Sequence, residues 1–292
     1  MNTLVRRLAD WIAASAPARQ AAGLRFSYEA VLCGVVYAAY TVVRNEFGSA
    51  AVAPEIAARN ADWIIDVQES MGLYIEAQVQ EVFIDWTAFI QFWNLFYGLF
   101  HFLVTFVVLI WLYFADPGRY RFWRRAGLWA TSSALVGFAV FPLMPPRLLG
   151  DCGPYGACRP DSPYVDTVRD VGGIWSFESS GMDALSNQYA AMPSLHIGWA
   201  LWCTLVLVPR LGPRWAKGLA IAYPVLTMFA IVVTANHYWI DGIGGVLAVG
   251  FGWVASTAWE RRMVGRHGGT ETPSSASADP AISTTVHARD PA

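Results

Sequence analysis

The sequence predicts an all-α polytopic membrane protein, in which six transmembrane helices form a bundle and amphipathic interfacial helices occupy the first outer loop. The first sign is composition, because 55% of the 292 residues are hydrophobic and only 14% are charged, whereas soluble domains have about 25% charged residues. The apolar residues also gather in long runs, and arginines cluster beside these runs. The lipid bilayer is therefore the expected solvent for most of the chain.

Six apolar runs are predicted to span the membrane as helices, because lipid offers no hydrogen-bond partner to an open backbone. Most of them approach the roughly 20 residues that a helix needs to cross about 30 Å of hydrocarbon, and the third and fourth are shorter. The runs are residues 28–43, a part of 83–114, 127–143, 195–208, 218–234 and 239–259, and they define one membrane domain over residues 28–263.

Four basic clusters predict the orientation, because cytoplasmic loops are enriched in Lys and Arg. One cluster precedes the first run and the others follow the second, fourth and sixth, so all of them fall on one side. We therefore expect both termini to be cytoplasmic and the loops at 48–82 and 144–193 to face outward. The clusters are Arg6, Arg7, Arg19 and Arg25, then Arg119, Arg121, Arg124 and Arg125, then Arg210, Arg214 and Lys217, and finally Arg261, Arg262 and Arg266.

The segments outside the apolar runs differ in composition. Residues 1–27 are expected to form a cytoplasmic segment, and residues 48–82 alternate apolar and charged side chains at helical spacing, which predicts amphipathic helices on the membrane surface. Residues 264–292 are rich in Gly, Ser, Thr and Ala without apolar periodicity, so this tail is expected to be disordered. Cys152 and Cys158 share a polar loop in which a disulfide could close, as is usual outside the cytosol. The net charge of −2 gives no reason to expect a nucleic-acid partner.

Two histidines and one aspartate are the strongest candidates for chemistry. His196 lies in AMPSLHIGWALW at the outer end of the fourth run, and His237 lies in TANHYWIDGIGG before the sixth, so the predicted topology puts both at one face. Asp241 follows His237 by four residues, a helical spacing that lets its carboxylate orient the imidazole. His237 could then act as a nucleophile and His196 as a general acid. The simplest alternative is that all three only cap helix ends or lie at the interface.

Arg147 and Ser194 are candidate phosphate ligands at the same rim. Arg147 follows the third run in FPLMPPRLLG and offers a guanidinium fork that suits phosphate oxygens, or a simple anchor in the headgroup layer. Ser194 adds a hydroxyl at the start of a helix, where a capping role is the ordinary one. His101, deep in the second run, is interpreted as structural, and Glu29 as an interfacial or capping charge.

The motifs PSLH and HYWID resemble the second and third signature motifs of the phosphatidic acid phosphatase type 2 superfamily, whose members are six-helix membrane enzymes. The run NLFYGLFH ending at His101, the PPR that contains Arg147 and the amphipathic segment resemble its inositolphosphotransferase-like branch, which includes inositol phosphorylceramide synthases. The resemblance covers residues 28–259.

This resemblance implies a lipid phosphate phosphatase or phospho-headgroup transferase that acts at the extracytoplasmic face of the cell membrane through a phosphohistidine. It implies that His237 is the nucleophile, Asp241 its orienting partner and His196 the acid for the leaving group, while Ser194 and Arg147 hold the phosphate. The substrate would be a membrane lipid phosphate of the phosphatidic acid, polyprenyl phosphate or phosphoinositide class, and the acceptor would be water or a polyol. No metal or other cofactor is expected.

Two cations of the superfamily motifs are missing from this chain. The first motif has a lysine where Val140 stands, and the third has an arginine where Ile231 stands. Arg159, Arg169 or another residue of the outer loop is the candidate substitute.

Other functions stay open from the residues alone. His196, His237 and Asp241 could bind zinc in a membrane hydrolase, which a chelator would inactivate. Ser194 could serve an intramembrane protease, although the sequence lacks a glycine-serine elbow. A lipid transporter or binding module would keep its function after His237→Ala.

Overall fold

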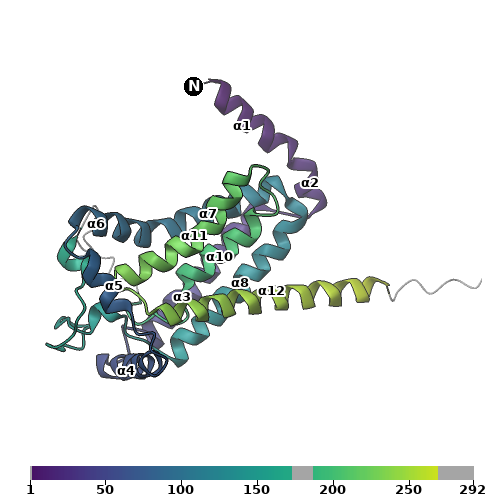
Figure 1. The fold of residues 1–292 in the computed structure, drawn as a ribbon. Helices are drawn as coiled ribbons and strands as arrows, with labels where there is room; N and C mark the ends of the chain where they lie inside the picture. The colour runs from purple at the N-terminus through teal and green to yellow at the C-terminus, as the bar shows by residue number, and fades with distance from the viewer. Residues whose placement is uncertain (1, 173–186, 269–292) are drawn as a thin grey trace, which may run out of the picture.

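The computed structural model describes residues 2–172 and 187–268, and over these ranges it is built from helices without a β-strand. Figure 1 shows α7, α8, α10 and α11 grouped in a bundle, from which α1 and the end of α12 extend. In chain order the helices are α1 (Asn2–Ala14), α2 (Ala16–Ala21), α3 (Phe26–Phe47), α4 (Pro54–Ser70), α5 (Glu76–Phe83), α6 (Thr87–Leu95), the π-helix η1 (Phe96–Phe100), α7 (His101–Ala115), α8 (Pro117–Val140), the 3-10 helix η2 (Pro146–Leu148), the π-helix η3 (Thr167–Val171), α10 (Leu195–Leu207), α11 (Arg214–Val233) and α12 (Trp239–Gly268).

Four helical segments of the described chain are long and apolar enough to cross a membrane. They correspond to the first, second, fifth and sixth predicted runs, so the chain has the character of a polytopic membrane protein. The segments are Phe26–Phe47, Thr87–Ala115, Arg214–Val233 and Trp239–Met263.

The third and fourth predicted runs are helical but do not meet both criteria for a span: α8 has 24 residues and is not apolar enough, whereas α10 is apolar but too short. α8 begins at Pro117, ten residues before the predicted start, so its first turns contain four arginines, and it ends at Val140 rather than at residue 143. α10 has 13 residues, which at 1.5 Å per residue cover about 20 Å. It packs against α7, α8, α11 and α12, and a helix surrounded by protein can be shorter than the hydrocarbon layer. Six full spans stay a prediction.

The basic clusters meet at one end of the bundle. Arg124, near the start of α8, pairs with Glu29 in the first turn of α3, and the same carboxylate accepts from the Tyr120 hydroxyl. Arg125 pairs with Glu260 near the far end of α12 at 2.9 Å. The starts of α3 and α8 and the end of α12 therefore form one arginine-rich end. Glu29 has an ion-pairing role there, not merely that of an isolated interfacial charge.

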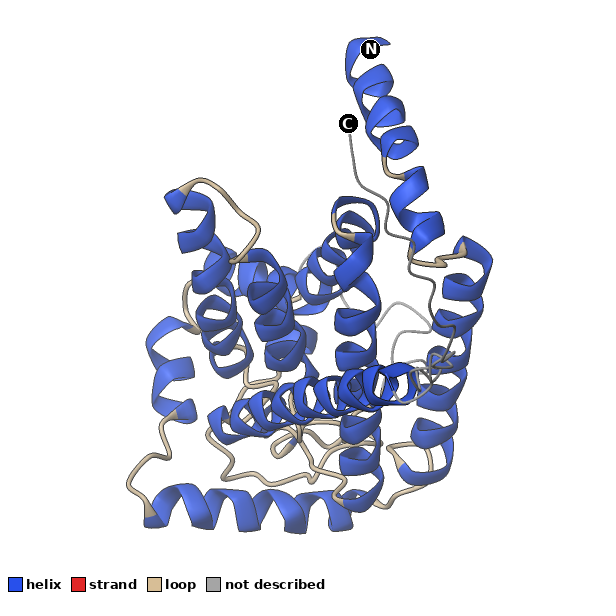
Figure 2. Cartoon of the chain, turned by 90° about the vertical axis from the view of Figure 1, so that its right-hand side faces the viewer, coloured by secondary structure: helices blue, strands red, loops and turns tan. Residues whose placement is uncertain are grey.

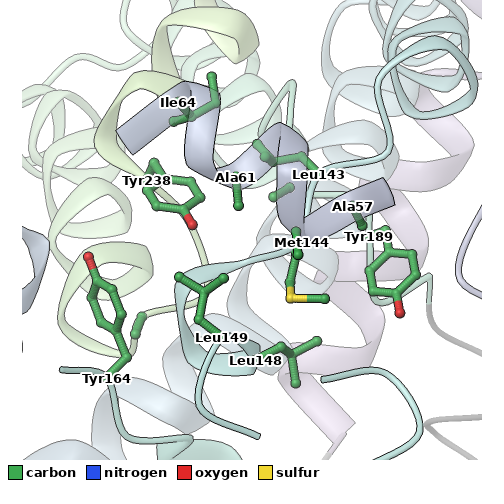
Figure 3. Close-up of a cluster of buried hydrophobic side chains, with 13 residues drawn as sticks. Ala57, Ala61, Ile64, Leu143, Met144, Leu148, Leu149, Tyr164, Tyr189 and Tyr238 are labelled. Atoms are coloured by element: carbon green, nitrogen blue, oxygen red, sulfur yellow. The ribbon is translucent and has the colours of Figure 1, made fainter. Parts of the chain in front are cut away.

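A second region, which we call the cap, covers the opposite end and consists of residues 48–83 and 142–172. Figure 2 shows α4, the lowest helix in Figures 1 and 2, lying crosswise over the end of the bundle. Its buried side packs on the loop after α8 and on the α11–α12 turn, whereas its contact with a membrane surface stays a prediction. Figure 3 shows this apolar cluster, whose buried members include Ala57, Ala61, Ile64, Leu143, Met144, Leu148, Leu149, Tyr164, Tyr189 and Tyr238.

Two further predictions concern the disulfide of the cap and the C-terminal tail. The sequence indicates that Cys152 and Cys158 could form a disulfide, and the structure shows this bond. The predicted tail begins at residue 264, but α12 continues to Gly268, and the remainder of that tail lies outside the described residues.

Close packing between α10 and α12 depends on a glycine. A Cβ atom at Gly245 would lie 2.3 Å from the carbonyl oxygen of Ser194, and this oxygen belongs to the backbone and cannot rotate away. A residue without a side chain at this position therefore lets the start of α10 lie directly against the first turns of α12. These are the two helix starts that carry the candidate residues.

Candidate active site

Three segments bring the two histidines and the aspartate together. His196 lies in the first turn of α10, His237 in the turn between α11 and α12, and Asp241 in the first turn of α12. The Nε2 atom of His237 lies 3.3 Å from Nδ1 of His196, and Nδ1 of His237 lies 3.3 Å from Oδ2 of Asp241. His237 and Asp241 are both buried. Residues that are 41 positions apart in the chain thus share one site.

The hydrogen bonds of His237 define its tautomer. Its Nδ1 atom also lies 2.8 Å from the carbonyl oxygen of Ala191. Both neighbours of Nδ1 are oxygen acceptors, so Nδ1 carries the ring hydrogen and donates it. In the neutral ring Nε2 then has a lone pair directed at Nδ1 of His196, and the Nδ1–H tautomer of His196 would donate to it. An imidazole held at one nitrogen by a carboxylate, with a lone pair on the other, has the arrangement of a nucleophile or base.

Asp241 has both a helix-capping and a histidine-orienting contact. Its Oδ2 atom accepts from the backbone N–H of Tyr238 at 3.0 Å, which is the return half of a capping box at the start of α12. Its backbone oxygen accepts from the N–H of Ser194 at 2.9 Å, which ties α12 to α10. Burial raises the pKa of the adjacent Tyr238 phenol well above its ordinary value, and the Asp241 carboxylate adds to this shift. The capping explanation and the catalytic one are therefore compatible.

Ser194 lies at the N-cap position of α10, yet its hydroxyl does not cap the helix. The side chain is fully buried, and Oγ has no hydrogen-bond partner among the described residues. A buried hydroxyl without a partner is unfavourable in a folded protein, and such groups often indicate a place where a ligand binds.

Arg147 is held by three side chains at the edge of the α11–α12 turn. Its Nε donates to Oδ1 of Asn236 at 2.9 Å, Nη1 to Oδ2 of Asp166 at 2.8 Å, and Nη2 to Oε1 of Gln188 at 2.5 Å. Its backbone N–H donates to the carbonyl oxygen of Ala235 at 2.8 Å. Arginine has five side-chain N–H groups, so these bonds to described residues leave donors for a phosphate oxygen. They also pair the guanidinium with a buried carboxylate.

The positions of the two missing motif cations do not contribute charge to the site. The Val140 side chain is 77% exposed at the end of α8, and Ile231 is fully buried among apolar neighbours. Arg159 pairs with Asp62, with Nη2 and Oδ2 at 2.8 Å, and hydrogen bonds to that carboxylate raise the pKa of the guanidinium.

Arg169 is paired as well, with Asp151 and with Asp170. The two candidate substitutes are therefore paired with carboxylates in the cap, as Arg147 is with Asp166, and their replacement of the missing cations stays a prediction.

Two aromatic residues on the second predicted run enclose His196. The ring of Tyr97 stacks on it at 4.2 Å between centroids, and the ring of His101 lies 4.0 Å from it. Nδ1 of His101 lies 3.0 Å from the carbonyl oxygen of Tyr97. Tyr97 belongs to the π-helix η1 and His101 directly follows it, and short π-helices inside α-helices are frequent at functional sites. His101, interpreted as structural from sequence, is thus a neighbour of the candidate acid.

Several residues of the site were not found from the sequence. Asn236 directly precedes His237, and Tyr97 lies in the run ending at His101, so local signals existed for these two. Asp166 and Gln188 lie in the loop without a recognisable pattern, and only the fold brings them to Arg147.

The geometry of the described residues can be compared with what a zinc hydrolase and a serine protease require. Within residues 2–172 and 187–268, no group of three His, Cys, Asp or Glu side chains is arranged to hold a metal ion. The hydroxyl of Ser194 has no hydrogen bond to a described histidine, whereas a serine nucleophile is activated by such a bond. The contacts of His237 are those of an imidazole that attacks or accepts a proton.

Comparison with known proteins places this site in a family. The family model described as the PAP2 superfamily matches residues 62–255, which contain all the residues of the site. No match was found among curated proteins or among solved structures. Because the match extends over more than half of the chain, the protein belongs to the PAP2 superfamily, which generally comprises phosphatases.

Proposed function

We propose that this membrane protein transfers the phosphoryl group of a lipid phosphate ester through a phosphohistidine at His237. The observation that supports this most directly is the arrangement of the His237 ring, with Nδ1 3.3 Å from the Asp241 carboxylate and Nε2 3.3 Å from Nδ1 of His196. A nucleophile, its orienting carboxylate and an acid are the three groups that such a transfer requires without a metal.

The first step forms a bond between Nε2 of His237 and phosphorus and breaks the bond from phosphorus to the lipid oxygen. His196 gives a proton to that oxygen, and Asp241 stabilises the positive charge of the phosphorylated imidazole. In the second step water or an alcohol attacks phosphorus, His196 takes its proton, and His237 is released. Because the His237 lone pair accepts from His196 in this arrangement, the His196 ring has to move before phosphorus can come within about 3 to 3.5 Å of Nε2.

Ser194 and Arg147 are the proposed phosphate ligands. The buried hydroxyl of Ser194 lacks a partner among the described residues, and the guanidinium of Arg147 is oriented by three bonds without using all of its donors. A fixed guanidinium and a hydroxyl at a helix start are suited to phosphate oxygens.

The charge around Arg147 favours a particular class of donor. Its ion pair with Asp166 joins side chains that are only 14% and 5% exposed, so the buried carboxylate neutralises much of the guanidinium charge. The motif cations at positions 140 and 231 are replaced by Val and Ile. A phosphomonoester would bring about two negative charges into this site, whereas a phosphodiester brings one. We infer that the donor is a phosphodiester lipid, so that His237 accepts the phospho-headgroup and passes it to the hydroxyl of an acceptor such as a polyol, or to water.

The two ends of the bundle support a proposal for the face of the membrane at which the site lies. The arginine-rich end is proposed to be cytoplasmic by the positive-inside rule, with both termini on that side. The cap lies at the other end and contains a disulfide, a bond that persists in oxidising compartments. The site beneath the cap is therefore proposed to face the extracytoplasmic side of the cell membrane.

A labelling experiment tests this function. Purified protein in lipid nanodiscs is incubated with phosphorus-labelled monoester and diester lipids, with and without polyols and a chelator, and then quenched in acid or in alkali. We expect label on the protein that survives alkali and is lost in acid, as a phosphohistidine requires, and turnover that persists in chelator. Label on a carboxylate or on serine would refute the mechanism, and loss of turnover in chelator would favour the zinc hydrolase. Transport of lipid without any ester cleavage would favour the transporter.

The donor class is tested separately by Asp166→Asn. The amide keeps an oxygen that can accept from Arg147 but removes the negative charge, so the guanidinium can balance a second phosphate charge. We expect the ratio of kcat/KM for a monoester to that for a diester to rise about tenfold, or about 1.4 kcal/mol.

The matched control is Asp62→Asn, which removes the same charge from the Arg159 ion pair, where the carboxylate is 44% exposed. An unchanged ratio in Asp166→Asn, or an equal rise in Asp62→Asn, would contradict the inference about donor charge.

A further inference from the structure

A carboxylate from the cap lies buried at the start of the catalytic helix α12. Glu76, the first residue of α5, is fully buried. Its Oε1 accepts from Nε2 of Gln68 at 2.5 Å and from the backbone N–H of Trp239 at 2.9 Å, and its Oε2 accepts from the N–H of Ile75 at 3.1 Å. All of these donors are neutral, and among the described residues Glu76 has no ion pair. Buried carboxylates without a cation are uncommon because desolvation is costly, so this group calls for an explanation.

The position of Trp239 gives that explanation. It is the first residue of α12, two residues after His237 and two before Asp241. The first N–H groups of a helix have no partner within the helix, and the positive end of the helix dipole favours an anion there. In α12 the Asp241 side chain accepts from Tyr238 N–H, and Glu76 accepts from Trp239 N–H. Two carboxylates, one from the helix itself and one from the cap, therefore share this helix start.

Other contacts also hold the start of α12 against the cap. Nε1 of Trp239 donates to the carbonyl oxygen of Leu73 at 2.7 Å, in the turn between α4 and α5. Figure 3 shows Tyr238 packed beneath α4 near Ala61 and Ile64. The cap thus contacts both Tyr238 and Trp239, the two residues that directly follow His237.

We propose that Glu76 is a positioning residue for the nucleophile: by accepting from the first N–H of α12, it fixes the helix start so that the His237 imidazole and the Asp241 carboxylate keep their mutual geometry. The proposal rests on the proposed function of His237 and adds a role for the cap. Glu76 does not contact the reacting atoms, so its effect acts through the position of the helix.

The size of the effect follows from the geometry of attack. Misplacing a reacting group by about 1 Å can lower a rate on the order of 100-fold. In Glu76→Ala the Trp239 N–H and the Gln68 amide lose their acceptor, so the helix start is free to shift. In Glu76→Gln one oxygen remains for Trp239, but the amide N–H₂ opposes the N–H of Ile75, so part of the restraint is kept.

Single-turnover formation of the phosphoenzyme tests the proposal in the full-length protein. We expect a rate about 100-fold lower in Glu76→Ala and no more than about tenfold lower in Glu76→Gln, with KM within about twofold of the wild type and a full complement of labelled sites. The matched control is Glu81→Gln, which removes the same charge from an exposed position on the same helix and should leave the rate unchanged.

The outcomes separate this proposal from a general folding role and from the proposed function. A variant that is merely less well folded would show fewer labelled sites, each with the wild-type rate, and this result would overturn the positioning role. Equal rates in Glu76→Gln and wild type together with an unaffected Glu76→Ala would also overturn it. If Glu76→Ala does not fold, a Glu76→Gln rate several-fold below that of the wild type with a full site count supports the proposal, and a rate equal to that of the wild type overturns it. If His237→Ala retains turnover, the proposed function itself fails, whatever the Glu76 variants do.

Discussion

Replacing His237 with alanine should abolish ester cleavage, with a loss of kcat/KM of about four orders of magnitude or more. The physical reason is that the nitrogen that forms the bond to phosphorus is removed, and no other described side chain is both held by a carboxylate and aimed at His196. Loss of a covalent nucleophile is expected to have effects of this size. The measurement is turnover of a labelled lipid phosphate by purified protein, combined with the labelling of the protein after an alkaline quench.

A second substitution separates chemistry from folding. His237 donates to Ala191 and contacts Asp241 in a buried place, so alanine leaves polar atoms without a donor and can lower stability by about 1 to 3 kcal/mol. Glutamine at the same position retains an N–H donor but has no nucleophilic nitrogen. We expect His237→Gln to be as inactive as His237→Ala, with a thermal unfolding temperature closer to that of the wild type. Turnover within tenfold of the wild type in either folded variant would remove His237 as the nucleophile.

The sequence alone was sufficient to identify the residues that meet through local geometry. The spacing of His237 and Asp241 predicts a contact across one helical turn. The structure places Nδ1 and Oδ2 3.3 Å apart, but His237 lies in the turn before α12, so the contact joins that turn to the helix. His196 was expected at the same face because both histidines lie at the ends of apolar runs, and the fold brings it against His237. In these cases a short separation along the chain and a membrane boundary limit where a side chain can lie.

Contacts across the cap could not be predicted in this way. Glu76 reaches Trp239 across 163 residues, and Asp166 reaches Arg147 from a loop with no periodic pattern. Glu76 accepts from backbone N–H groups and Asp166 from a guanidinium. Sequence alone gives no reason why these two, and not other acidic residues of the cap, should bind those donors. The role of Glu76 becomes visible only when the path of α4 and α5 over the start of α12 is known.

The number of full spans could not be fixed from sequence either. The roughly 20-residue length of a span assumes that lipid surrounds the helix, and this assumption holds for α3, which has almost no buried residues. It fails for α10, whose 13 residues are covered on several sides by other helices, so protein rather than lipid sets its length. It fails in a different way for α8, because the charged turns at its start pair with Glu29 and Glu260.

The second large effect is expected for His196→Ala, whose cost should depend on the leaving group. With an alkyl lipid alcohol, whose oxygen leaves only when it is protonated, we expect kcat/KM to fall about 1,000-fold, within the range that general acid catalysis supplies. With a nitrophenyl phosphodiester the departing oxygen is already a stable anion, so the loss should be no more than about tenfold. The measurement is the rate of each substrate with wild type and variant under identical conditions.

This comparison distinguishes acid catalysis from a purely spatial role of the same ring. His196 also stacks with Tyr97 and His101, and its Nδ1–H is hydrogen-bonded to the nucleophile. If its main effect were to orient His237 or to pack between those rings, removing it would slow attack on both substrates by the same factor, because attack by Nε2 is common to them. Equal losses would therefore reject His196 as the acid, whereas a loss confined to the alkyl substrate can arise only from the proton that the leaving oxygen needs.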